Sequence, residues 1–206
     1  MFMKVSRTVI SSLLIGSALL SFTACSPKYD LSPKALADYA DDQGADEADS
    51  PDEFYNTVLN YGSDDYMIYV YGDPDDFDGF ESVIGYDERA DEITQCIMQD
   101  GEVYAYIYSI SFDQDDATDY YKEQIKYYEY HSSDAYYVNV TESSNLQYIL
   151  YATSESDYIA IYHDGSTNSV LCMDFRGGDE DDVKEIADEI CKDFGVVSPS
   201  TLFDEN

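Results

Sequence analysis

The sequence predicts an α+β fold, an antiparallel sheet with helices packed on one face. Side chains alternate strictly along residues 103–112, as is typical of a half-buried strand. Asp-Gly pairs at residues 100–101 and 164–165 separate two pairs of such runs and are strong hairpin signals. Apolar residues spaced three and four apart along residues 181–194 indicate a helix with one buried face. Hairpins followed by separate helices define this class.

The body of the chain is expected to use one ββα design three times, built from strands at 54–61 and 66–72 with a helix from about 75, strands at 93–98 and 103–112 with a helix at 115–130, and strands at 158–163 and 169–175 with a helix at 181–194. Residues 136–141 and 146–153 are expected to form an extra hairpin. Residues 92–98 could instead continue a helix, and the second unit would then lose its first strand.

Before this body, Ser32 and Pro33 suit the start of a helix and Gly44 suits its end, which predicts a short helix over residues 33–43. Residues 45–53 are acidic and lack an apolar period, so they are expected to form a loop. The predicted organisation is a tether with a short helix at 25–53, one α+β domain at 54–197 and a tail at 198–206.

The first residues have the layout of an export signal. Lys4 and Arg7 precede a short apolar run at 8–20, and Phe22-Thr23-Ala24-Cys25 follows. This ending resembles the lipobox of bacterial lipoproteins, although Phe22 stands where that pattern usually has Leu. The resemblance implies that residues 1–24 form a signal peptide that is removed, and that Cys25 becomes the acylated first residue.

Two alternatives to lipidation fit these residues less well. Ordinary secretory cleavage requires small residues one and three positions before the cut, which Ala24 satisfies and Phe22 does not. A transmembrane helix needs about 20 apolar residues, more than this run supplies. The resemblance therefore implies a small surface lipoprotein, anchored by lipid at the extracytoplasmic face of the cell membrane.

The charge of the chain restricts its partners. The 206 residues contain 44 Asp and Glu against 10 Lys and Arg, for a net charge of −34. Nucleic acid is excluded as a partner, because phosphates are bound through basic groups that this chain almost lacks. Cations or a basic protein partner fit such a surface. We also expect stability to depend on salt or calcium, because self-repulsion opposes the compact state.

A four-residue phrase, Asp-x-Asp-Asp, follows each predicted hairpin. Calcium prefers several carboxylate oxygens, so the phrases are candidate sites for weakly bound calcium, and no other cofactor is expected. Helix capping and dipole compensation are the favoured alternative. The candidate metal-ligating residues are Asp73, Asp75, Asp76, Asp113, Asp115, Asp116, Asp179, Asp181 and Asp182.

Catalysis has little support in the sequence. The two histidines, His131 and His163, are expected at exposed element boundaries, and no familiar nucleophile, zinc or phosphate-binding motif occurs. The sequence therefore favours a non-catalytic binding or interaction module. The alternative is a hydrolase of envelope polymers that uses carboxylates, but any set of 44 acids contains plausible pairs.

Cysteine and tyrosine leave further alternatives open. Cys191 lies on the apolar face of the last predicted helix and is expected to be a buried thiol, while a bridge to Cys172 on a neighbouring strand is a less favoured possibility. The 22 tyrosines are expected to serve mainly as strand formers in the core and its rim. Outward-facing tyrosines remain candidates for binding.

Overall fold

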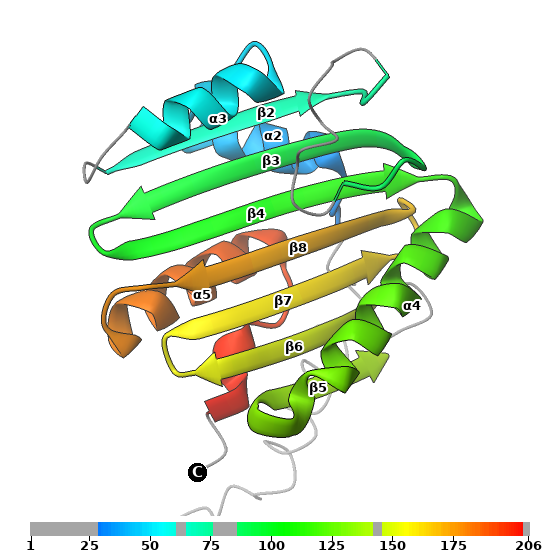
Figure 1. Ribbon diagram of the computed structural model, residues 1–206, viewed down its shortest axis with the longest axis vertical. Coiled ribbons are helices and arrows are strands. Elements are labelled where there is room, and N and C mark those ends of the chain that lie inside the picture. The colour runs from blue at the N-terminus through cyan, green and yellow to red at the C-terminus, as the bar shows by residue number, and fades with distance from the viewer. Residues whose placement is uncertain (1–28, 61–64, 76–85, 142–145, 204–206) are drawn as a thin grey trace, which may run out of the picture.

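The computed structural model describes residues 29–60, 65–75, 86–141 and 146–203 (Figure 1). The strands form one open sheet in the order β1-β2-β3-β4-β8-β7-β6-β5. Every neighbouring pair is antiparallel except β1 and β2. The strands are β1 (Asp46–Glu47), β2 (Tyr66–Gly72), β3 (Ala90–Asp100), β4 (Val103–Phe112), β5 (Tyr136–Thr141), β6 (Leu146–Ser154), β7 (Asp157–Asp164) and β8 (Ser169–Arg176).

The sheet consists of two meanders, β2–β3–β4 and β5–β6–β7–β8, which meet where β4 pairs with β8. Four α-helices and two short 3-10 helices complete the described fold. They are α2 (Pro33–Asp42), α3 (Pro51–Asn60), α4 (Gln114–Tyr130), α5 (Glu180–Phe194), η2 (Ser132–Asp134) and η3 (Pro199–Phe203).

Helices cover both faces of the sheet. Residues of α2, α5 and η3 pack on one face, here called the α2–α5 face, and residues of α3 and α4 pack on the other, the α3–α4 face (Figure 1). The α+β class and the antiparallel sheet are thus confirmed, whereas the restriction of helices to one face was wrong.

Strand β4 explains why both faces are covered. Its alternation is as predicted, with Ala105 and Ile107 on the α2–α5 face and Tyr106 and Ile110 on the α3–α4 face. All four are buried. Because tyrosine rings carry large apolar area, the tyrosine-bearing side is a second hydrophobic surface that also needs a cover.

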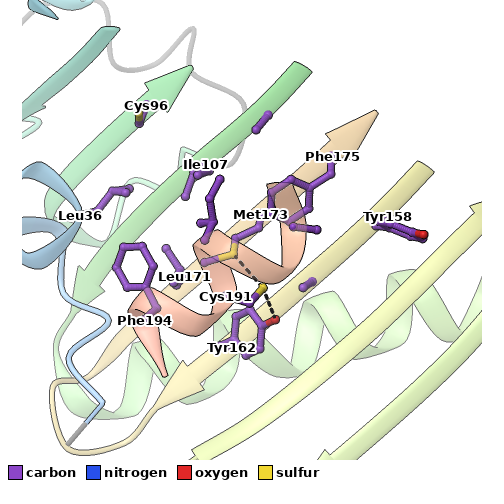
Figure 2. Packing of buried hydrophobic residues seen from close by; sticks show 14 of the residues in the cluster. Leu36, Cys96, Ile107, Tyr158, Tyr162, Leu171, Met173, Phe175, Cys191 and Phe194 are labelled. Carbon is purple, nitrogen blue, oxygen red and sulfur yellow. Dashed lines mark hydrogen bonds between the residues drawn. The ribbon is translucent and has the colours of Figure 1, made fainter. Parts of the chain in front are cut away.

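The core on the α2–α5 face is closely packed around α5, as Figure 2 shows. The thiol of Cys191 lies 3.8 Å from the sulfur of Met173 and 3.6 Å from the hydroxyl oxygen of Tyr162. The Tyr162 hydroxyl in turn donates to the Val197 carbonyl at 2.5 Å. This core therefore satisfies its few polar groups internally.

The three described cysteines are free and buried. Cys191 belongs to the core of the α2–α5 face and Cys172 to that of the α3–α4 face. The sheet lies between these two cores, so a Cys172–Cys191 bridge is ruled out and the buried-thiol interpretation is confirmed. Cys25 lies outside the described residues.

The second and third predicted ββα units are confirmed, as β3–β4–α4 and β7–β8–α5. The extra hairpin is confirmed as β5–β6, and residues 92–98 are strand, so the helical alternative was wrong. The first unit differs, because residues 54–60 belong to α3. Its expected helix from about residue 75 lies mostly outside the described residues.

A capping box explains the error at α3. The Ser50 hydroxyl accepts a hydrogen bond from the Glu53 backbone N–H at 3.2 Å, and the Glu53 carboxylate accepts one from the Asp49 N–H at 2.8 Å. Pro51 occupies the first helical position. These start signals override the strand preference of the following Phe, Tyr, Thr and Val residues. The expected loop at 45–53 was wrong for the same reason, and it also contains β1.

Residues expected in the tether contribute to the core from Leu31 onward. The helix predicted over 33–43 is confirmed as α2, and the Ser32 hydroxyl caps it by accepting from the Ala35 N–H at 3.2 Å. Two buried hydroxyls hold its start against the sheet: Thr94 donates to the Pro33 carbonyl at 2.6 Å and Ser109 donates to the Leu31 carbonyl at 2.5 Å.

The expected tail also packs against the domain. Within η3, the Ser200 hydroxyl donates to the Asp188 carboxylate at 2.5 Å, and the Phe203 ring centroid lies 4.6 Å from that of Tyr136. Residues 199–203 therefore close the end of the α2–α5 face beside β5, β6 and β7.

Candidate functional site

The three Asp-x-Asp-Asp phrases do not meet at one place. Asp73 follows β2 and Asp113 follows β4. These two strands run in the same direction, so both phrases lie where their C-terminal ends meet. Asp179 follows β8, which runs in the opposite direction, so the third phrase lies at the opposite ends of the strands. Asp76 lies outside the described residues.

The positions of the second and third phrases are those of helix starts. Asp113 and Asp179 occupy the N-cap positions of α4 and α5, although neither side chain accepts a capping hydrogen bond. The following acids lie in the first helical turn, where they complement the helix dipole. Among the described residues, no group of three or more His, Cys, Asp or Glu side chains is arranged to hold a metal ion. Calcium binding stays a prediction.

Near the first two phrases, Arg89 compensates part of the negative charge of the surrounding carboxylates. Its guanidinium donates two hydrogen bonds to Asp87, at 2.7 and 2.6 Å, and lies 3.7 Å from Asp116 and 3.6 Å from Glu123. These hydrogen bonds lower the pKa of Asp87. Nearby, desolvation and then repulsion from other aspartates raise the pKa of Asp91. Arg89 thus ties the start of β3 to α4.

A groove follows α2 and α5 along the other helical layer and is our candidate site. It consists of three adjoining hollows of about 500, 480 and 350 Å³. The first and second share Tyr39 and Asp193, and the second and third share Asp100, Ile186 and Glu189. We call this continuous feature the α2–α5 groove.

The middle hollow has several apolar side chains in its lining, which we call the floor of the groove. Met67 of β2 and Met98 of β3 are directly opposite in the sheet and both line the middle hollow. Ile186 and Ile190 of α5 line it from one side and the Tyr39 ring from the other. Tyr39 also packs on Phe194, with ring centroids 5.1 Å apart. Methionine side chains adapt to partners of different shapes, which suits a binding floor.

The walls of the groove are strongly acidic. Burial, followed by repulsion from Asp193, raises the pKa of the Tyr39 hydroxyl. Lys34 is the single base among the described lining residues, and Asp38 already pairs with it at 2.6 Å. The ten lining carboxylates are Asp30, Asp38, Asp42, Asp65, Asp100, Glu102, Asp182, Glu185, Glu189 and Asp193.

One predicted metal-ligating residue, Asp182, lines this groove. The other described members of the nine line none of the three hollows. Sequence reasoning missed the groove because its lining comes from α2, from the paired strands β2 and β3 with the β3–β4 turn, and from α5, which are far apart in the chain. The Met67–Met98 pair carries no local signal, since its meaning depends on strand register.

The two histidines have different environments. His131 is exposed at the end of α4, as expected. His163 is only 7% exposed and stacks on Tyr121 with ring centroids 5.3 Å apart, so the expectation of exposure was wrong there. Its turn neighbour Asp164 accepts hydrogen bonds from Ser166 and Thr167, which engages that carboxylate in the β7–β8 turn.

No protein-family model, curated protein or solved structure matches this chain. Among the described residues, no helix has the length and apolar character needed to cross a membrane.

Proposed function

We propose that this protein is a non-catalytic binding module of the cell envelope, lipid-anchored through Cys25, that holds a basic partner in the α2–α5 groove. The observation that carries the proposal is the combination of an apolar, methionine-containing floor with ten carboxylates and one paired lysine along the walls. An amphipathic segment with a basic face matches both features, because its apolar side chains fit the floor and its ammonium or guanidinium groups meet the walls.

The position of the groove relative to the predicted anchor supports a partner close to the membrane. Asp30 and Ser32 line one end of the groove, and Leu31 between them is fully buried. Leu31 follows Cys25 by six positions in the sequence. Six extended steps span about 20 Å at most. The groove would therefore lie near the bilayer surface when Cys25 is acylated.

The hydrolase alternative gains no specific support from these hollows. Among the described carboxyls, desolvation raises the pKa of Asp91 and of Asp174. Neither lines the groove, and Asp174 is engaged by the Arg176 guanidinium. A carboxyl kept protonated inside a binding cleft would have favoured general acid catalysis.

The test is a calorimetric titration of the full-length protein in detergent with a 15-residue amphipathic peptide of Lys and Leu. The double variant E189Q/D193N removes two charges from the groove walls and should weaken binding by at least tenfold. The control D115N/E129Q removes two charges from exposed positions of α4 and should change the affinity less than threefold.

Two outcomes would refute the proposal. Equal weakening by both double variants would mean that the peptide responds only to net charge and that the groove is not its site. Absence of binding at millimolar peptide in 0.15 M NaCl would refute the proposal that the protein binds a basic amphipathic partner.

A further inference from the structure

The two edge strands of the sheet, β1 and β5, differ in how they are protected from pairing with a further strand. At one end, β1 has only two residues, both acidic and exposed, which is a common way to prevent further strand pairing. At the other end, β5 has six residues, with no charged residue, no proline and no register break against β6. Among the described residues, no strand pairs with the outer edge of β5.

Exposed apolar side chains flank this open edge on both faces of the sheet. Tyr136 is 52% exposed and Val138 is 38% exposed on β5 itself, and Tyr127 and Tyr130 lie near the end of α4, which contacts β5. These are four of the five large apolar side chains that are exposed in the described chain. Exposed apolar side chains on both sides of an unpaired strand edge are consistent with an interaction surface there.

The balanced charge around β5 favours an uncharged partner at its open edge over a basic one. Residues 120–141, which include the end of α4 and all of β5, contain two Lys, two Glu and one Asp. This is nearly balanced in a chain whose net charge is −34. Repulsion between two copies of the chain would be weakest where these segments meet.

We propose that two copies of the chain associate by antiparallel pairing of their β5 strands, which joins the two sheets into one. The strand is self-complementary in the register that places Val138 opposite Val138 of the second copy. Tyr136 then lies opposite Val140, and an aromatic side chain beside a β-branched one is a favourable cross-strand pair. No charged residue lies within the paired strands in this register, because β5 has none.

This arrangement is compatible with the predicted lipid anchor. Antiparallel strands of one continuous sheet are related by a two-fold axis perpendicular to the sheet, so both copies present the same face in the same direction. Leu31 packs on the α2–α5 face, and the preceding residues lead to Cys25. Both anchors could therefore enter the same bilayer.

Charge substitution at the two-fold axis provides the test. Sedimentation of the full-length protein in detergent should show dimers whose fraction increases between 0.05 and 0.5 M NaCl, because salt screens the repulsion of two anionic bodies. Val138→Lys and Val138→Glu each place like charges opposite each other and should weaken dimerisation at least tenfold. An equimolar mixture of the two variants should restore a mixed dimer.

Leu59→Lys is the matched control, since Leu59 is 81% exposed on α3, at the other end of the sheet, and its substitution should leave dimerisation unchanged. In addition, Val138→Cys should form an intermolecular disulfide, because directly opposed strand residues have suitable Cα separations. The described native cysteines are buried and should not compete.

Several results would overturn the assignment. A protein that stays monomeric at 0.1 mM in 0.5 M NaCl does not use this edge for a second copy. Dimers that persist in Val138→Lys, or a Lys and Glu mixture that stays monomeric, would exclude the proposed register. Failure of Val138→Cys to cross-link under oxidation would do the same.

Discussion

His163 is a buried ionisable side chain with an incomplete set of partners. Within the part of the chain that the structure describes, neither its Nδ1 atom nor the hydroxyl of the stacked Tyr121 has a hydrogen-bond partner. Burial lowers the pKa of His163, while attraction to Asp164 opposes the shift. The folded chain therefore disfavours the charged imidazolium.

This environment predicts a pH dependence of stability. Because the pKa is lower in the folded state, the unfolded chain binds a proton first as the pH falls below about 6.5. The contribution of His163 to the free energy of unfolding is complete above that pH and decreases toward the lower folded-state pKa. Urea unfolding between pH 7.5 and 5.5 should thus show that the wild type loses stability relative to His163→Phe, which keeps the stacked ring but cannot be protonated.

His131→Phe is the control, because His131 is exposed at the end of α4. It should leave the pH dependence of the wild type in place. A constant stability difference between wild type and His163→Phe over this pH range would contradict the prediction.

At the scale of elements, the connection from β8 to α5 fixes the helix that forms one wall of the groove. Gly177 has a φ of +82°, and a Cβ atom there would lie 2.4 Å from the Glu102 carbonyl oxygen of the β3–β4 turn. The backbones of these two turns are therefore in close approach. The right placement of α5 depends on the absence of a side chain at this position.

Gly177→Ala should consequently lower the free energy of unfolding by about 3 kcal/mol, because it combines a left-handed backbone with steric overlap. Gly44→Ala separates the two effects, since Gly44 has a φ of +81° but a Cβ atom there would meet nothing within 4 Å. That variant should cost only about 1 kcal/mol. Equal costs in chemical denaturation would show that the contact with Glu102 does not matter.

At the scale of the whole molecule, net charge opposes folding. Most of the 44 acids must share the surface of a single compact unit, and the few described bases are largely paired, as in Lys34–Asp38 and Arg89–Asp87. Self-repulsion of this kind is relieved by screening. Stability should therefore rise with ionic strength.

Thermal unfolding of the full-length protein should show a Tm about 5 °C or more higher in 0.5 M than in 0.01 M NaCl. In 0.15 M NaCl, 5 mM calcium and 5 mM magnesium should raise Tm equally. The described aspartate phrases lie at opposite ends of the strands, so they do not combine into one site that would prefer calcium. A Tm that does not respond to NaCl would contradict the role of repulsion. A calcium effect several degrees larger than that of magnesium would indicate a discrete calcium site.

Local patterns were sufficient for most elements. Asp-Gly turns and strict alternation identified β3–β4 and β7–β8, and the 3.6-residue period identified α4 and α5, because these signals arise within a few consecutive residues. The same reasoning failed at α3, where the start signal of Ser50 and Glu53 outweighed strand propensity. It also failed for the second helical layer, since the tyrosine side of β4 could be interpreted as rim or as core.

The sequence alone determined the acidic character of this protein and predicted most of its strands and helices. Only the tertiary structure decided which acids share a surface, because that depends on strand direction and helix placement. In the folded chain, the third aspartate phrase lies far from the first two, and the α2–α5 groove forms from three segments that are distant in the sequence. Strand β5 lies at the edge of the sheet. Side-chain chemistry is local, whereas a binding surface is produced by long-range packing.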